Sequence, residues 1–493
     1  MLFNSLDFII FFPIVSAIFF ALQHRFRWIW LLVASCYFYM AFVPAYILIL
    51  VVTIIIDYVS GLVIEPAKGA KRRLFLIISL VANIGMLAVF KYYNFLIDNT
   101  ETLSAWMGIA THLPHLSILL PIGLSFHTFQ SMSYTIEVYR GNQPAERHFG
   151  IFSLYVLFYP QLVAGPIERP QNLLYQFHGE RHFSYQNASD GLKLMLWGMF
   201  KKVVVADRLA MIVDYVYNNP SNYDTGLPLL LATYAFSLQI YCDFSGYSDI
   251  AIGAAQFMGY DLMRNFNRPY LSQSIPEFWR RWHISLSTWF KDYLYISLGG
   301  NRVSVPRWYF NLFFVFLVSG LWHGASWNFV IWGALHGFYQ IFGLATADLR
   351  NRFNTAIGLV KMPRLHTAIK WFVTVHLAAF AWIFFRAVTF NDAWHVITNI
   401  YKVDIGFLVQ NASSLGTGKR LLEIGAGRND LIILCITVAV MFFVEIWQGD
   451  RHDVRSLFAE QPKWRRWAIY YALFLAIVVW GVFRQSSFIY FQF

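Results

Sequence analysis

The run Ala45-Tyr-Ile-Leu-Ile-Leu-Val-Val-Thr-Ile-Ile-Ile-Asp-Tyr-Val-Ser-Gly-Leu-Val63 is almost wholly apolar. A helix that crosses the hydrocarbon core of a bilayer needs about 20 predominantly apolar residues. The run therefore predicts a membrane-spanning helix. Comparable runs recur near residues 8–23, 28–43, 74–90, 118–136, 150–164, 190–206, 227–243, 308–321, 327–345, 369–386, 430–447 and 467–483. Several are short or interrupted, so we expect about ten to twelve transmembrane helices with re-entrant or interfacial helices among them.

The composition agrees with a protein that lies in the membrane. Of its 493 residues, 58% are hydrophobic and only 13% are charged, whereas soluble domains have about 25% charged residues. Too little polar surface remains to cover a soluble core, and the chain is too apolar to stay disordered. Its 3 cysteines all lie in apolar stretches, which excludes a disulfide scaffold. The sequence predicts an all-α polytopic membrane protein with a single membrane-embedded domain over residues 1–493.

Basic residues in the short loops predict the orientation. Lys and Arg concentrate in the cytoplasmic loops of membrane proteins. The segment before the first span has none, whereas the following loops carry Arg25, Arg27, Lys68, Lys71, Arg72 and Arg73. This pattern puts both the N-terminus and the C-terminus outside the cytoplasm, and it indicates that residues 8–23 are retained as a span. The same loops explain the net charge of +11, so we expect no nucleic-acid partner.

Polar residues at membrane depth concentrate in residues 240–345. Strongly polar groups are costly in lipid, so they mark a protein interior or a functional site. Asp243 and Asp249 flank Gly246 in an otherwise apolar run, where we expect the glycine to break the helix. Either the two carboxylates support that break or they act directly, for example in a proton relay.

The segment from Phe278 to Arg302 is too charged to cross lipid. It interleaves four basic residues with three tryptophans: Arg280, Arg281, Lys291 and Arg302 with Trp279, Trp282 and Trp289. This composition fits an interfacial or re-entrant helix pair. The basic side chains and the indole faces are suited to the phosphates and adenine of a nucleotide-like cofactor. Anchoring at the membrane interface would produce the same composition.

His323 lies in Leu321-Trp-His-Gly-Ala-Ser-Trp-Asn328, between the apolar segments 308–321 and 329–335, and His336 and Gly337 close the second segment. We expect a helix junction there, with Gly324 allowing close approach to the His323 ring. Histidine is the side chain best suited to move a proton near neutral pH. Other histidines fit structural roles: Ser, Thr and Gln neighbours are expected to satisfy His127, and the Trp394-His395 pair suits the membrane interface. The sequence contains no recognisable metal-binding spacing, so we expect no metal.

Several motifs together resemble the bacterial membrane-bound O-acyltransferase family, in its alginate O-acetylase-like branch. They occur in this order along the chain: Pro160-Gln-Leu-Val-Ala-Gly-Pro-Ile-Glu-Arg169, Trp197-Gly-Met-Phe-Lys-Lys202, Ala206-Asp-Arg208, Phe278-Trp-Arg-Arg-Trp-His-Ile-Ser-Leu-Ser287, Asp292-Tyr-Leu-Tyr295, Gly299-Gly-Asn-Arg302, Leu321-Trp-His-Gly324 and Phe488-Ile-Tyr-Phe-Gln-Phe493. One departure is Ser297, where the family pattern has proline.

The resemblance implies an enzyme that moves an acetyl group from cytoplasmic acetyl-CoA towards an extracytoplasmic polysaccharide, such as alginate or peptidoglycan. It implies a ring of tilted helices around a central tunnel in the bacterial inner membrane. By the same resemblance His323 is the catalytic histidine and His283 is a second functional histidine. It also implies a separate extracytoplasmic SGNH-type, esterase-like partner. Acetyl-CoA is then a substrate, and no cofactor is permanently bound.

Chemistry assigns roles to the neighbouring residues. His323 is placed to act as a general base, and His283, Trp322 or Asn328 to donate to the developing oxyanion or to position the reactants. Arg280, Arg281, Lys291 and Arg302 are candidates for binding the acyl donor. Two alternatives stay open. One is D-alanyl transfer to teichoic acid by the same fold, and the other is a proton-coupled transporter or flippase that uses His323, Asp243 and Asp249.

Overall fold

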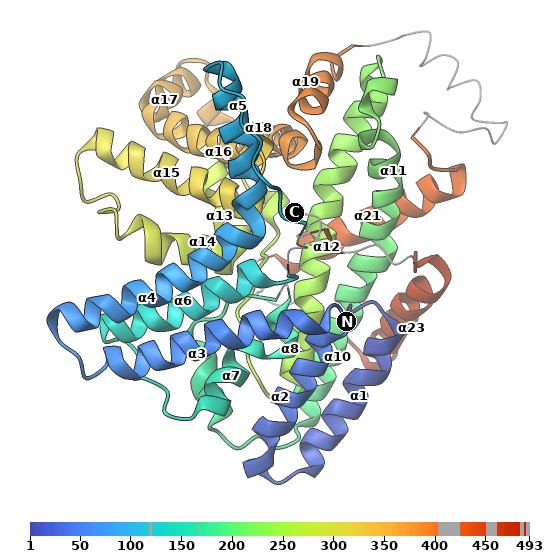
Figure 1. Cartoon of the computed structure of the whole chain (residues 1–493). Coiled ribbons are helices and arrows are strands. Elements are labelled where there is room, and N and C mark those ends of the chain that lie inside the picture. The colour runs from blue at the N-terminus through green and yellow to red at the C-terminus, as the bar shows by residue number, and fades with distance from the viewer. Residues whose placement is uncertain (118–120, 164, 403–423, 450–460, 484–487, 490–493) are drawn as a thin grey trace. The chain divides into compact units, whose positions relative to one another are not determined.

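The computed structural model describes residues 1–117, 121–163, 165–402, 424–449, 461–483 and 488–489. Every regular element in these ranges is a helix, as the all-α prediction requires (Figure 1). The chain divides into two compact units. Unit 1 comprises residues 1–195, 247–264 and 490–493, and unit 2 comprises residues 196–246 and 265–489. The prediction of a single domain over residues 1–493 stays a prediction.

Five helices in the described residues are long and apolar enough to cross a membrane: Pro44–Ile64, Gly69–Trp106, Gly226–Phe257, Pro363–Arg386 and Arg428–Gln448. The bent pair Trp327–Ala345 and Ala347–Ala356 adds a sixth if the pair counts as one span. These segments confirm the membrane assignment by length and composition. The count of ten to twelve stays a prediction.

Unit 1 begins with the long N-terminal helices. Its helices are α1 (Leu6–Ala21), α2 (His24–Met40), η1 (Pro44–Tyr46), α3 (Ile47–Ile64), α4 (Gly69–Leu87), η2 (Ala88–Tyr92), α5 (Tyr93–Trp106), α6 (Leu124–Arg140), α7 (Phe149–Leu157), α8 (Tyr159–Leu162), α9 (Pro170–Leu173) and η3 (Leu174–Phe177). The boundary between the units falls within α10 (Tyr185–Met199) and α12 (Gly226–Phe257).

Unit 2 carries the motifs around the predicted histidines. Its further helices are η4 (Phe200–Ala206), α11 (Asp207–Tyr217), η5 (Pro220–Asn222), η6 (Pro269–Leu271), α13 (Ile275–Arg281), α14 (Ile284–Trp289), η7 (Phe290–Tyr295), α15 (Val305–His323), α16 (Trp327–Ala345), α17 (Ala347–Ala356), η8 (Leu359–Lys361), α18 (Pro363–Arg386), α19 (Phe390–Asn399), α21 (Arg428–Gln448) and α23 (Lys463–Trp480). Three of the short elements, η2, η4 and η7, are π-helical turns, which occur often at functional sites.

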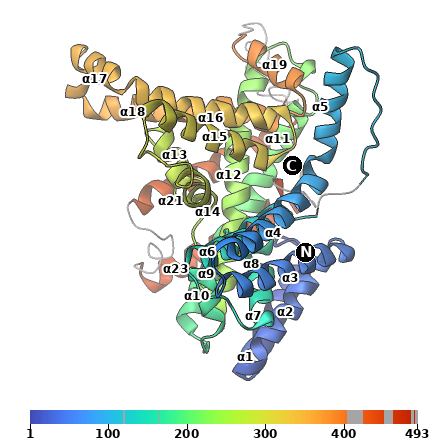
Figure 2. The same cartoon turned by 60° about the vertical axis from the view of Figure 1, so that its left-hand side comes forward.

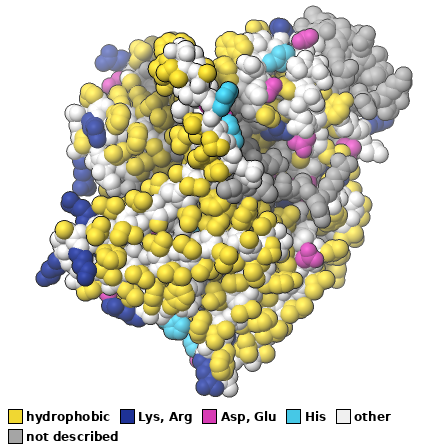
Figure 3. Space-filling model, viewed as in Figure 1, with side chains coloured by type: hydrophobic (Ala, Val, Ile, Leu, Met, Phe, Trp, Pro, Cys, Tyr) yellow, Lys and Arg dark blue, Asp and Glu magenta, His cyan; other side chains and the backbone are white. Residues whose placement is uncertain are grey.

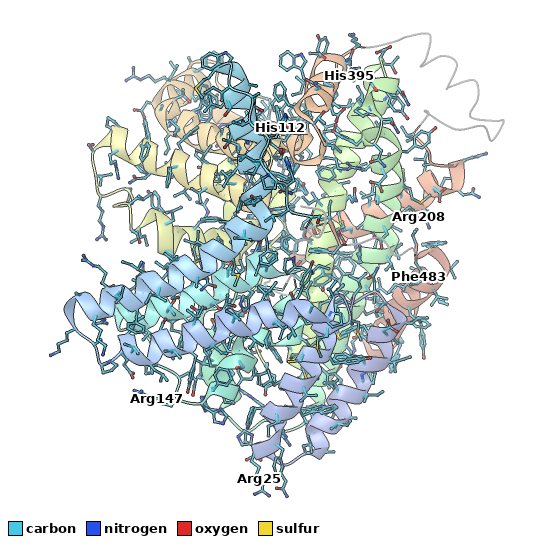
Figure 4. The ribbon with its side chains drawn as sticks, in the orientation of Figure 1. Arg25, His112, Arg147, Arg208, His395 and Phe483 are labelled. Atoms are coloured by element: carbon cyan, nitrogen blue, oxygen red, sulfur yellow. The ribbon has the colours of Figure 1, made fainter. Side chains whose placement is uncertain are left out.

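The outer faces of α3 and α4 match a lipid environment. Their exposed side chains include Leu48, Val52, Ile55, Leu74, Ile77 and Val81, and hydrophobic side chains cover much of the face in Figure 3. Lys68, Lys71 and Arg73 are exposed at the turn between these helices. Arg25, at the start of α2, is also exposed (Figure 4). These basic side chains therefore lie at exposed helix ends, as the loop pattern used to predict the orientation requires. The orientation itself stays a prediction.

A polar cluster lies between α3, α4 and α6, which run side by side in Figure 1. The buried carboxylate of Asp57 accepts hydrogen bonds from Ser79 Oγ at 2.6 Å and from Asn83 Nδ2 at 3.0 Å. His127 Nε2 lies 2.7 Å from Thr53 Oγ1. His127 is therefore held by a threonine of another helix, not by its own sequence neighbours. Such polar contacts join helices where lipid gives no hydrophobic driving force.

The predicted helix break at Gly246 is wrong, because α12 runs unbroken from Gly226 to Phe257. Gly246 instead permits close packing: a Cβ atom there would lie 2.7 Å from the Gly198 carbonyl oxygen. Asp243 supports no break either. Its carboxylate pairs with Lys202 Nζ at 2.7 Å, and Lys202 also pairs with Asp207 at 2.8 Å.

Other motif residues hold unit 2 together. Arg208 of α11, labelled in Figure 4, pairs with Asp430 of α21 and donates to the Trp480 carbonyl at 2.6 Å. His395 of α19, also labelled there, lies 3.0 Å from the Tyr223 carbonyl through Nε2, while Trp394 is exposed. The tail motif lies largely outside the described residues, since only Phe488 and Ile489 belong to them.

Candidate active site

The junction predicted around His323 is present as a tight turn between α15 and α16, which lie side by side in both ribbon views (Figures 1 and 2). α15 ends at His323, and Ser326 caps α16 by accepting the backbone N–H of Asn328 at 3.2 Å. Gly324 permits the turn to close, because a Cβ atom there would lie 2.1 Å from the Phe329 ring. The expectation that Gly324 also allows close approach to the His323 ring stays a prediction.

His323 is buried at this turn, with 4% of its surface exposed. Its ring lies 4.9 Å from the Trp322 ring, 4.9 Å from the Trp332 ring and 5.1 Å from the Phe385 ring, centroid to centroid. These aromatic walls exclude water from the imidazole. A histidine in such a site is held in place and acts on a reactant with little competition from solvent.

His283 lies in the break between α13 and α14 and is completely buried. Its φ of 42° is in the left-handed region. Among the described residues other than glycine, Arg268 is the only other one with a positive φ. Such backbone strain persists only where the surroundings enforce it, and it often marks functional sites. Here Asn265 supplies the restraint: its carbonyl accepts the Ile284 N–H at 2.9 Å, and its side chain accepts the Ser285 hydroxyl at 2.6 Å.

Trp322 contacts both predicted histidines. Its ring centroid lies 6.2 Å from that of His283 and 4.9 Å from that of His323. The two histidines therefore share one buried aromatic neighbour, although they are separated in the sequence. Asn328 is also buried nearby, but its Nδ2 donates to the Ala387 carbonyl at 2.9 Å.

The predicted donor-binding residues lie on the outside of the segment from Phe278 to Arg302. Arg280, Lys291 and Arg302 are exposed. Arg281 is only half-buried, and Glu277 pairs with it at 2.8 Å. The local fold explains their exposure: Ser274 caps α13 by accepting the Glu277 N–H, and the apolar face of that helix buries Phe278 and Trp279. Whether the basic side chains bind an acyl donor stays a prediction.

Most of the predicted tryptophans line the interior. Trp279, Trp282, Trp289 and Trp322 are buried, whereas Trp327 is 57% exposed. Its place is the first position of α16, on the side opposite the buried stripe that includes Trp332 and His336.

Two buried residues of α16 received no role from the sequence, although they adjoin His323. The Trp332 ring contacts the His323 ring directly. His336 lies one turn further along α16, and its ring centroid is 4.9 Å from that of Trp332. Their spacing of four residues on one helix face is visible in the sequence. Only the tertiary contacts show that this face meets His323. The described residues contain no cluster of metal-ligating side chains.

Comparison with known proteins identifies the class. Residues 146–389 match the model of MBOAT, the membrane-bound O-acyltransferase family. The chain is also 40% identical over 410 residues to the "Probable alginate O-acetylase AlgI" of Pseudomonas aeruginosa, covering 82% of this chain and 75% of that protein. The chain belongs to the membrane-bound O-acyltransferase family, and it is an O-acyltransferase.

Two further relatives show the range of the family. The "Peptidoglycan O-acetyltransferase" of Helicobacter pylori is 36% identical over 396 residues, which cover 75% of this chain and 72% of that protein. The "Teichoic acid D-alanyltransferase" of Bacillus subtilis is 25% identical over 294 residues, covering 57% and 72%. The similarity to the two O-acetylating relatives is thus higher and extends over more of the chain.

Proposed function

We propose that this enzyme transfers an acetyl group from cytoplasmic acetyl-CoA towards a hydroxyl group of an extracytoplasmic polysaccharide, such as alginate or peptidoglycan. The observation that carries the proposal is the burial of His323 beside Trp322, which also contacts His283. This arrangement occurs in a chain that is 40% and 36% identical to relatives named as O-acetylating enzymes. Reaction within a buried site lets the acetyl group cross the inner membrane while the intact donor stays on the cytoplasmic side.

His323 is the general base in this proposal. One ring nitrogen takes the proton of the acceptor hydroxyl while the hydroxyl oxygen attacks the thioester carbon. Positioned general-base help of this kind is worth roughly 10²–10⁴ in rate. Breaking the carbon–sulfur bond releases CoA, whose thiolate recovers the proton from His323. Trp322, whose ring contacts both histidines, and His283 position the reactants.

The exposed side chains of Arg280, Lys291 and Arg302 suit the phosphates of acetyl-CoA. Arginine binds phosphate through two parallel hydrogen bonds, and lysine binds it as a point charge. Glu277 already neutralises Arg281 in part, so we assign Arg281 a smaller share of that binding. Acetyl-CoA is a substrate in this account, and no permanently bound cofactor takes part.

A separate extracytoplasmic partner completes the proposal. We infer that an SGNH-type, esterase-like protein receives the acetyl group and passes it to the polymer. Adding purified polysaccharide to the enzyme alone tests this step. Efficient acetylation of the polymer without a second protein would contradict the need for a partner.

Radiolabelled acetyl-CoA tests the donor and the reaction class together. Purified full-length enzyme in proteoliposomes should release free CoA and transfer or hydrolyse the label. A D-alanyl transferase would instead use a D-alanyl donor and leave acetyl-CoA intact. A proton-coupled transporter or flippase would release no CoA from either donor.

A further inference from the structure

Helices α15 and α16 are in unusually close contact. A Cβ atom at Gly320 would lie 2.2 Å from the Phe329 carbonyl oxygen, and one at Gly333 would lie 2.4 Å from the Phe316 carbonyl oxygen. The two helices therefore touch backbone to backbone. This contact holds the Trp332 ring against His323, with the ring planes at 85°.

The hydrogen bonding of His336 fixes which of its nitrogens carries the proton. Trp279 donates its indole N–H to His336 Nδ1 at 3.2 Å. An indole nitrogen only donates, so Nδ1 must be the unprotonated acceptor. The neutral ring then carries its proton on Nε2. This Nε2–H is buried and has no acceptor in the part of the chain that the structure describes.

Trp332 presents a second buried donor. The ring is completely buried, and its Nε1–H also lacks an acceptor among the described residues. Neighbouring donors differ: Trp382 donates to the Tyr270 hydroxyl at 3.1 Å, and Asn328 donates to the Ala387 carbonyl. Leaving a buried N–H without an acceptor is costly, and few such groups occur in native proteins. Here two such N–H groups lie on the adjacent rings of Trp332 and His336, and the Trp332 ring contacts His323. This arrangement points to an acceptor that comes with the substrate.

We propose that Trp332 Nε1–H and His336 Nε2–H bind the carbonyl oxygen of the acetyl group that is transferred. This inference rests on the proposed function. As the acceptor oxygen bonds to the carbonyl carbon, its proton passes to His323 and the carbonyl π electrons move onto the oxygen. The two donors stabilise the resulting negative charge. When the C=O bond re-forms, the C–S bond breaks, and the CoA thiolate takes the proton from His323.

Two substitutions at His336 separate this role from a structural one. Asn places an acceptor near the position of Nδ1, so H336N keeps a partner for Trp279 but loses the donor at Nε2. Gln reaches the position of Nε2, so H336Q keeps that donor but loses the acceptor for Trp279. W332F removes the second donor and keeps an aromatic ring. W382F is the matched control, because it removes a buried indole N–H that already has an acceptor.

The measurement is kcat and KM for acetyl-CoA, with purified full-length variants in proteoliposomes. Loss of a single oxyanion donor typically lowers kcat by roughly 10²–10³. W332F and H336N should lose at least tenfold in kcat with KM within about threefold. H336Q should retain a higher kcat than H336N, and W382F should stay within about fivefold of wild type. Thermal unfolding of each variant shows whether it is folded.

Three outcomes would contradict the proposal. W332F and H336N within twofold of wild type would show that no donor is needed. The reverse order, with H336N active and H336Q inactive, would show that His336 only holds Trp279. Failure of folded wild-type enzyme to consume acetyl-CoA would contradict the proposed function itself, and this inference with it.

Discussion

The indole N–H of Trp279 donates to Nδ1 of His336 across 3.2 Å, which connects α13 to α16. The bond fixes the protonated nitrogen of His336. W279F should release that restraint and let the proton move to Nδ1 in part of the molecules. We expect kcat for acetyl transfer to fall about threefold to tenfold, less than for W332F, because the donor is still present in the remaining molecules. Steady-state kinetics with acetyl-CoA checks the order, and an unchanged kcat would show that the bond has no influence on the reaction.

The ion pairs of Lys202 predict a large effect on stability. Its ammonium group is buried between the carboxylates of Asp207 and Asp243, at 2.8 Å and 2.7 Å. K202M would leave both carboxylates buried without this cation, which typically costs about 3–5 kcal/mol. K193M is the control, since Lys193 pairs with Asp190 at 2.9 Å in a more exposed position, where an ion pair contributes less. Thermal unfolding in detergent should show a much lower midpoint for K202M than for K193M, and equal midpoints would contradict this account.

The Asp57 cluster predicts a graded loss of stability in unit 1. D57A leaves the donors of Ser79 and Asn83 without their acceptor, at a typical cost of about 1–3 kcal/mol for each buried group. D57N retains one acceptor oxygen and should lower the unfolding midpoint less. If D57A unfolds at the wild-type temperature, these hydrogen bonds contribute nothing measurable to the stability.

Glu168 predicts a pH dependence. Burial raises the pKa of this carboxyl group to about 7, while Asn172, the Met263 backbone N–H and Arg169 act in the opposite direction. Because the folded pKa is above the unfolded value of about 4.3, the folded state binds more protons between those values. The stability contribution of Glu168 is therefore complete below the unfolded pKa and is lost as the pH rises through about 7.

E168Q removes that titration. The difference in unfolding midpoint between E168Q and wild type should shift in favour of E168Q as the pH rises from 5.5 to 8. Any constant cost of the substitution is the same at each pH, so only the slope tests the prediction. A difference that does not change with pH would mean that the pKa of Glu168 is not raised.

The sequence was informative where composition and local pattern decide the structure. Long apolar runs predicted the helices, and His323 between two such runs predicted the junction of α15 and α16. The family motifs predicted the class of enzyme. Each of these conclusions depends on residues that are close together in the chain.

The sequence was not informative where tertiary packing decides the outcome. A glycine within an apolar run can break a helix or let another backbone approach, and Gly246 does the second because Gly198 packs against it. The roles of Trp332 and His336 depend on whether their N–H groups find acceptors, which the tertiary contacts decide.

The central claim is that His323 is the general base of acetyl transfer, and one substitution tests it directly. Purified H323A, shown to be folded by its thermal unfolding, should consume radiolabelled acetyl-CoA with a kcat/KM lowered by roughly 10²–10⁴ relative to wild type. The loss should appear in kcat, with little change in KM. If H323A transfers the label within a few-fold of wild type at equal protein level, His323 is not the catalytic base.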